Sequence, residues 1–160
     1  MIRKATIADA NQICDIYNYY VLNTTVSFEE SAVTAAEMAE RINNVITTLP
    51  WIVYEENGII IGYAYASKWR ARSAYRFSVE SSVYMRHDQK GKGIGTILYR
   101  SLIDQLKIQG VHTVIGGVAE SNPASSKLHE KFGFEKVATF KEVGFKNDQW
   151  LETSYWQLIL

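Results

Sequence analysis

The chain has little of several residues that mark large classes of protein. Cys14 is its one cysteine, so no internal disulfide can form, and only two prolines occur in 160 residues. No apolar run approaches the roughly 20 residues of a membrane-spanning helix, and residues 1–4 lack the apolar stretch of a secretory signal. We therefore expect one domain over residues 1–160, cytoplasmic and without a membrane partner.

Neither sign of charge is in excess. Lysine plus arginine and aspartate plus glutamate number 17 each, so the chain lacks the basic field that attracts nucleic acid, and we expect no such partner. No group of histidine and cysteine has the spacing of metal ligands, and we expect no metal. Hydrophobic residues make up 47% of the chain, which is typical of a globular domain with a core.

Hydrophobic periodicity predicts an α/β chain in the order β-α-α-β-β-β-α-β-α-β-β, with helices on both faces of a mixed sheet. Capping boxes at Thr6 to Asp9 and Thr34 to Glu37 begin two helices. Residues 93–109 predict a third, with Ile97 on its apolar face, and Asn122 to Gly133 bound a fourth. The expected strands are residues 2–5, 51–55, 59–69, 77–85, 113–119, 134–145 and 150–160, with turns near Asn57–Gly58 and Asn147–Asp148.

Residues 84–96 give the strongest chemical signal. Gly91, Gly93 and Gly95 alternate with other residues, Lys90 and Lys92 stand before and between them, and a helix pattern follows. Glycine allows successive backbone N–H groups to face one side of a turn, and a helix start adds unpaired N–H groups and the positive end of its dipole. Such a loop is typical of a phosphate or pyrophosphate site.

The spacing of these glycines excludes two common phosphate loops. A P-loop needs Lys and then Ser or Thr after its last glycine, and the dinucleotide fingerprint is Gly-x-Gly-x-x-Gly after a first strand. What remains is an ordinary tight turn, or a pattern like Arg/Gln-x-x-Gly-x-Gly/Ala. The latter resembles the pyrophosphate loop of the GNAT acetyltransferase superfamily, with Lys90 in the Arg/Gln place.

Other segments resemble the same superfamily over nearly the whole chain. Residues 122–134 are similar to its later motif, with His129 in the usual Tyr place. The segments that resemble the phosphinothricin and methionine sulfoximine N-acetyltransferases are residues 23–28, 72–75, 79–84, 128–130, 143–146 and 150–152. This resemblance implies a GNAT fold with a mostly antiparallel sheet of about seven strands. It also implies acetyl coenzyme A (acetyl-CoA) as cosubstrate, a small L-amino acid or analogue as acceptor, and a homodimer.

The resemblance implies roles for two proton-transfer groups. Glu80 is the expected general base, acting through a water, because an amino-acid amine must lose protons to attack a thioester. His129 is expected near the sulfur, where a histidine can give a proton or share in deprotonating the amine. The alternatives are a solvated glutamate and a packed histidine.

The resemblance also implies the coenzyme contacts. Two strands are expected to splay apart and free the backbone N–H groups of Val83, Tyr84 and Met85, and Asn122 is expected to contact the pantetheine arm. The phosphates are expected on a loop that comprises Lys90, Gly91, Lys92, Gly93, Ile94, Gly95 and Thr96.

Arg72 and Tyr75 match the family's substrate segment, where arginine can bind a carboxylate with two parallel hydrogen bonds; a basic surface loop is the alternative. Phe28 is a candidate pocket wall, and Glu29 stands where relatives often carry Arg, which leaves the exact substrate open. The aromatic rings of Trp150, Tyr155 and Trp156 could form a dimer interface or fill the core. Peptide N-terminal acetylation and a non-catalytic coenzyme-binding module remain as competing functions.

Overall fold

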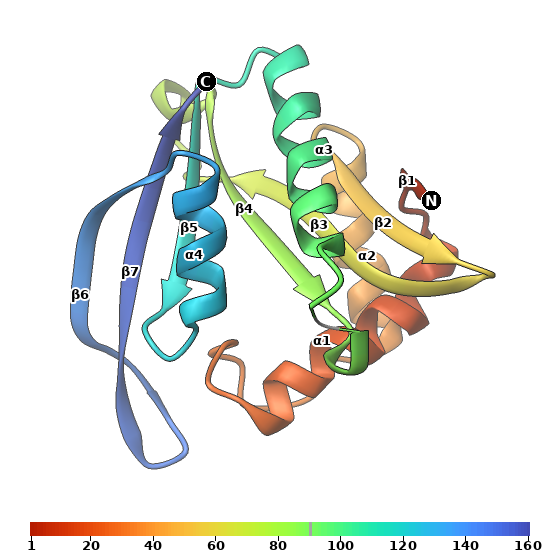
Figure 1. Ribbon diagram of the computed structural model, residues 1–160, viewed down its shortest axis with the longest axis horizontal. Helices are drawn as coiled ribbons and strands as arrows, with labels where there is room; N and C mark the ends of the chain where they lie inside the picture. The colour runs from red at the N-terminus through yellow and green to blue at the C-terminus, as the bar shows by residue number, and fades with distance from the viewer. Residues whose placement is uncertain (90) are drawn as a thin grey trace.

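The computed structural model describes residues 1–89 and 91–160, which form one seven-stranded sheet with helices on both faces (Figure 1). The strands are β1 Ile2–Lys4, β2 Trp51–Glu56, β3 Ile59–Lys68, β4 Ser78–Met85, β5 Thr113–Ala119, β6 Glu135–Lys146 and β7 Gln149–Ile159. The α-helices are α1 Ala10–Asn23, α2 Ala35–Ile46, α3 Ile94–Ile108 and α4 Pro123–Lys131. The predicted order of elements and the predicted fold class are confirmed.

Local sequence explains where the helices begin. At α2, the Glu37 N–H donates to Thr34 Oγ1 at 3.2 Å and the Thr34 N–H donates back to Glu37 Oε2 at 2.7 Å, so the predicted capping box forms. The box at Thr6 and Asp9 starts a short 3₁₀ turn, and α1 follows at Ala10. Each of these helix starts is therefore determined by a capping box of four consecutive residues.

The sheet runs in the order β1-β2-β3-β4-β5-β7-β6 and separates two apolar layers. Side chains of α1 and α2 pack on one face and those of α3 on the other (Figure 1). Along α3 the fully buried residues are Leu98, Tyr99, Leu102 and Leu106. Ile97, predicted on the same apolar face, is 51% exposed, because it lies beside the row of leucines that recurs every four residues.

The hairpin of β6 and β7 forms one edge of the sheet, drawn in blue in Figure 1. It turns at Asn147 and Asp148, both with positive φ, as the turn residues predicted. Trp156 is 6% exposed and packs in the core, so for this ring the structure supports core filling over an interface. Trp150 is 61% exposed, because it lies near the end of the hairpin, beyond the helices.

Candidate active site

The strands β4 and β5 separate in the middle of the sheet. They are the one parallel pair in the part of the chain that the structure describes, and they pair only from Ser78–Thr113 to Glu80–Ile115. Beyond this point β4 pairs only with β3 and β5 only with β7, which leaves a gap between β4 and β5. Residues of both strands line a cavity of about 50 Å³ there, with Tyr99, Asn122 and His129.

The antiparallel pairing with β3 decides which backbone groups of β4 face this gap. The Arg86 N–H donates to the carbonyl of Ile61 at 2.8 Å, directly after β4. Because donors alternate along an antiparallel strand, the N–H of Tyr84 is directed toward β3 and those of Val83 and Met85 away from it. The Met85 carbonyl already accepts a hydrogen bond from the Tyr20 hydroxyl at 2.7 Å. The gap therefore offers the Val83 and Met85 N–H groups.

The glycine loop leads directly into α3. Gly91 and Gly93 have φ values of 84° and 75°, which glycine adopts at little cost, and Gly93 is the N-cap. Gly95 has no such value; it lies in the first turn, and a Cβ there would contact Met85 at 3.6 Å. The N–H groups of Ile94, Gly95 and Thr96 open the helix, where N–H groups lack intrahelical acceptors. This is a seat for an anion.

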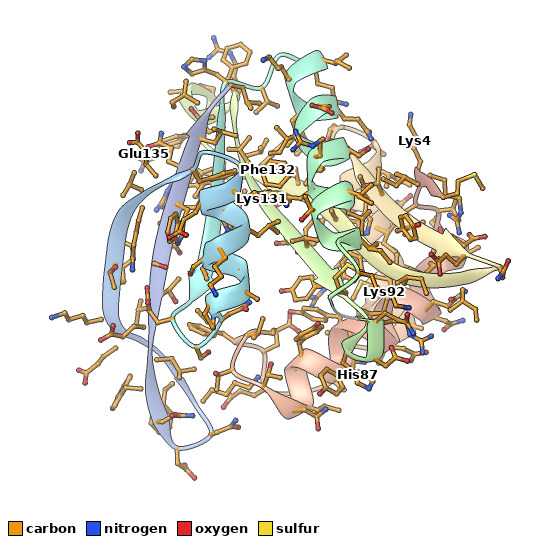
Figure 2. All side chains as sticks on the ribbon, in the orientation of Figure 1. Lys4, His87, Lys92, Lys131, Phe132 and Glu135 are labelled. Carbon is orange, nitrogen blue, oxygen red and sulfur yellow. The ribbon has the colours of Figure 1, made fainter. Side chains whose placement is uncertain are left out.

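The side chain of Lys92 adds positive charge at the same end of α3. Lys92 Nζ donates to Gln89 Oε1 at 2.6 Å and is exposed next to the helix start (Figure 2). Lys90, also predicted in this site, lies outside the described residues. The loop thus has at least one cation beside the free N–H groups of α3.

Glu80 lies on the α1 side of the sheet, where it lines a cavity of about 340 Å³ with Phe28 and Tyr84. Burial raises the pKa of its carboxyl group above the ordinary value of 4.5. Phe28 reaches this cavity because the facing residue of β6 is Gly144, where a Cβ would overlap the Phe28 ring. The pairing of β6 with β7 is irregular between Phe140 and Gly144, as is common beside sites.

His129 lies on the opposite face of the sheet and is 4% exposed. Its Nδ1 is 2.7 Å from the carbonyl of Ser125, and its Nε2 is 3.3 Å from the Tyr99 hydroxyl, which lies 2.7 Å from Ser81 Oγ. Because a carbonyl only accepts, Nδ1 carries the proton and Nε2 accepts from Tyr99. Burial lowers the pKa of His129, which favours the neutral imidazole.

Adjacent glycines of β5 bring the two groups toward each other through the sheet. A Cβ on Gly117 would lie 3.1 Å from Glu80 Oε1. A Cβ on Gly116 would overlap the ring of His129 on the other face. Glutamate and histidine therefore approach one short stretch of β5 from opposite sides.

Comparison with known proteins assigns the chain to a family. Residues 2–154 match the acetyltransferase (GNAT) domain. The chain belongs to the GNAT acetyltransferase family. It is 36% identical to a phosphinothricin N-acetyltransferase of Streptomyces viridochromogenes, over 98% of this chain and 85% of that protein. It is 37% identical to an L-methionine sulfoximine/L-methionine sulfone acetyltransferase of Salmonella typhimurium, over 99% of this chain and 94% of the relative.

Solved structures agree with this assignment. A GNAT-superfamily phosphinothricin acetyltransferase of Sinorhizobium meliloti, crystallised in complex with acetyl-CoA, is 39% identical and superimposes with a TM-score of 0.96. The alignment covers 100% of this chain and 88% of that one. The resemblance stated from the motifs is confirmed.

Within this GNAT domain six of the predicted site residues line the two cavities. Asn122 caps α4, where its side chain accepts from the Ser125 N–H at 3.3 Å, and it lines the gap cavity with Val83, Tyr84 and His129. Phe28 and Glu80 share the larger cavity.

Arg72 and Tyr75 lie apart from these cavities. Both are exposed, in the 3₁₀ turn before β4, and neither is among the described residues that line the two cavities. Arg70 of the same loop is nearer: its guanidinium carbon lies 5.1 Å from the Trp69 ring, and that ring contacts Tyr155, which lines the larger cavity.

Sequence reasoning missed the glycine pair and the Tyr99 hydroxyl. Residues 113–119 were interpreted only as an apolar central strand, although glycine inside a strand marks a place where another group approaches the backbone closely. Tyr99 has no comparable signal, because its place in α3 is that of a core residue; it is 0% exposed.

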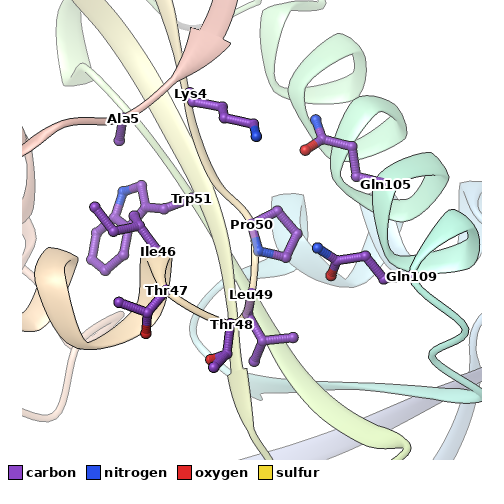
Figure 3. A pocket seen from close by; sticks show the side chains of 10 residues that line it. All are labelled: Lys4, Ala5, Ile46, Thr47, Thr48, Leu49, Pro50, Trp51, Gln105 and Gln109. Atoms are coloured by element: carbon purple, nitrogen blue, oxygen red, sulfur yellow. The ribbon is translucent and has the colours of Figure 1, made fainter.

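A third cavity, of about 270 Å³, lies at the end of β2 away from this site (Figure 3). It is lined by Lys4, Gln105 and Gln109 among others, and by none of the predicted site residues.

Among the described residues no group of three or more His, Cys, Asp or Glu side chains could hold a metal ion. No helix within these residues is both long and apolar enough to cross a membrane.

Proposed function

We propose that this GNAT enzyme transfers an acetyl group from acetyl-CoA to the amine of a small L-amino acid, or of an analogue of the methionine sulfone, methionine sulfoximine or phosphinothricin type. One observation supports the proposal above the others. The gap cavity and the larger Glu80 cavity share Val26, Tyr84, Gly117 and Ala119 as lining residues. An amine in one cavity can therefore reach a thioester in the other.

The residues of the gap fit the coenzyme. The α3 start and its glycines suit a pyrophosphate, because backbone N–H groups and Lys92 meet its negative charge. The N–H groups of Val83 and Met85 suit the amide groups of a pantetheine arm, since they face the gap and not β3. Asn122 completes this row at the start of α4. Acetyl-CoA is the cosubstrate that these features and the relatives support.

Glu80 is the group that starts the reaction within this proposal. Its carboxylate takes a proton from the ammonium group through a water, which leaves a nitrogen lone pair to attack the carbonyl carbon. Partial burial raises the pKa of Glu80, and a stronger base removes this proton more readily. As the new C–N bond forms, the C–S bond breaks and sulfur leaves with the electron pair.

His129 is suited to the second proton. The attacking nitrogen must lose one more proton, and the departing thiolate must gain one. A neutral imidazole with Nδ1 bound to the Ser125 carbonyl offers Nε2 as an acceptor, so it can take this proton and pass it to sulfur. Before Nε2 takes the proton, the Tyr99 hydroxyl turns its hydrogen from Nε2 toward Ser81 Oγ, which lies 2.7 Å away. In this scheme His129 supplies no net proton.

Arg72, Tyr75 and Phe28 remain our candidates for holding the acceptor, with Arg70 as the nearer alternative. Phe28 already lines the Glu80 cavity. Arg72 and Tyr75 require the 3₁₀ turn to approach it, or a second copy of the chain to bring them there.

We further propose a cytoplasmic protein with no nucleic-acid or membrane partner. We propose that it is a homodimer, since Trp150 and other apolar side chains of the β6–β7 hairpin are exposed. Light scattering at micromolar concentration tests the dimer, and a monomer mass would refute it.

A thiol-release assay tests the reaction. Purified protein with acetyl-CoA is offered free L-amino acids, methionine sulfone, methionine sulfoximine, phosphinothricin and a short peptide with a free N-terminus. We expect turnover with at least one amino acid or analogue and little with the peptide. Turnover with the peptide alone would favour N-terminal acetylation, and coenzyme binding without any turnover would favour the binding module.

A further inference from the structure

The cavity that holds Glu80 has an uneven distribution of charge. Two of its described lining residues, Glu29 and Glu80, are acids, and none of them is lysine or arginine. The remaining walls are aromatic, aliphatic or hydroxyl-bearing side chains and glycine. Glu80 is used by the proposed reaction as a base, whereas Glu29 has no part in it.

The Glu29 carboxylate is held firmly in this wall. Arg41 Nη1 donates to Oε1 at 2.7 Å and Nη2 lies 3.3 Å from Oε2, and the Tyr17 hydroxyl donates to Oε1 at 3.0 Å. The Glu29 N–H also donates to Ser27 Oγ at 3.3 Å. The side chain nevertheless stays 37% exposed, so its charge faces the open cavity.

The cations that contact this wall are both engaged. Arg41 is the ion-pair partner of Glu29 and does not itself line the cavity; its guanidinium lies 5.9 Å from the centre of the Tyr17 ring. Lys146 is 3% exposed, and its Nζ donates to the carbonyls of Val21 and Ser27 at 2.7 Å each. Of this ion pair only the carboxylate lines the cavity, so a ligand bound there lies beside its negative member.

We propose that Glu29 determines specificity: the cavity accepts an L-amino acid whose side chain ends in a neutral polar or cationic group and discriminates against a second anion. A negative group beside Glu29 would be repelled and would lose its water shell without gaining a partner. This inference rests on the proposed function. Within the substrate class named there, it favours a sulfone over a phosphinate.

The test compares kcat/KM for L-methionine sulfone and L-phosphinothricin at saturating acetyl-CoA. Both compounds share the α-amine and α-carboxylate, so the ratio of sulfone to phosphinothricin reports mainly the charge of the side chain. We expect a wild-type ratio above roughly ten, since like charges brought together lower affinity strongly. Glu29→Gln should lower the ratio by about tenfold, because it leaves the Arg41 charge unbalanced at the wall.

Arg41→Gln separates a charge effect from a merely structural one. Both substitutions break the same ion pair, so a structural role would move the ratio in the same direction for both. Charge control predicts opposite directions, with Arg41→Gln raising the ratio. Glu30→Gln removes the same charge from an exposed neighbour that does not line the cavity, and it should leave the ratio within about twofold.

The outcomes are distinguishable. A wild-type ratio near one, or shifts of the same sign for the Glu29 and Arg41 variants, would overturn the inference and leave the proposed function intact. A wild-type protein that acetylates no amino acid or analogue would refute the proposed function, and this inference with it. If Glu29→Gln fails to fold by circular dichroism, the rise expected for Arg41→Gln still decides the question.

Discussion

Glu80→Gln should make the protein more stable while it abolishes most of the activity. In the folded protein, partial burial raises the pKa of Glu80 above 4.5. The folded state therefore holds this proton more tightly than the unfolded chain does. As pH rises from the unfolded pKa, near 4.5, to the raised pKa of the folded state, Glu80 ionises first in the unfolded chain, and the free energy of unfolding falls over this range. Above that range the destabilisation is constant, and below about pH 4 it vanishes because both states are protonated.

The size of the effect follows from the same linkage. Each unit of raised pKa corresponds to about 1.4 kcal/mol of lost stability at high pH. For a domain of this length, a gain of about 1 kcal/mol raises Tm by about 2–4 °C. Glutamine keeps the shape of the side chain and lacks the charge, so Glu80→Gln should melt higher than wild type at pH 8 and equally at pH 4. Turnover should fall by roughly 10²-fold or more, as for a lost general base.

Differential scanning calorimetry across pH, together with the thiol-release assay, measures both effects. Glu135→Gln is the matched control, because Glu135 is exposed on β6 and lies away from both cavities. It should change neither rate nor melting. A Glu80→Gln protein with normal turnover would refute the assignment of the base. A Tm gain that persists at pH 4 would refute the explanation by burial.

The other predictions concern the coenzyme, the buried network and the substrate anchor. Gly93→Asp should abolish the thermal stabilisation by acetyl-CoA, because it strains a positive φ and adds a negative charge; unchanged affinity in a folded variant would count against the loop. Tyr99→Phe keeps the ring packing but removes the hydroxyl next to His129, and kcat should fall by about tenfold with little change in KM for acetyl-CoA. His129→Ala should lower kcat further, and a near-normal rate would remove it from the mechanism. Arg72→Ala should lower kcat/KM for the amino acid, with a loss of ~2–4 kcal/mol in transition-state stabilisation. If Arg70→Ala has that effect and Arg72→Ala does not, the anchor is Arg70.

Local sequence determined the elements of this fold and the location of its coenzyme loop. The capping box of Thr34 and Glu37, the turn at Asn147 and Asp148 and the helix pattern after Gly93 each depend on residues within one or two turns of chain. Their conformations follow from backbone preference and from hydrogen bonds to near neighbours. For the same reason, strand and helix order could be predicted before any long-range contact was known.

The resemblance to a family added catalytic roles for particular residues, which hydrophobic periodicity cannot predict. Glu80 alternates on β4 like any strand residue, and His129 is one position in a short helix. Each lines one of two cavities that share four lining residues. Their roles stay predictions until the variants are measured.

Only the tertiary structure decided which face each side chain meets and which groups come close. The pairing of β4, β5 and β7 set Gly116 and Gly117 between Glu80 and His129, across a register that joins segments more than 30 residues apart. The hydrogen bonds of Tyr99 with Ser81 and His129 depend on how α3 and α4 pack against that register. The burial of Trp156 was beyond local pattern for the same reason: strand periodicity fixes that alternate residues share a face, and only packing fixes which face is covered.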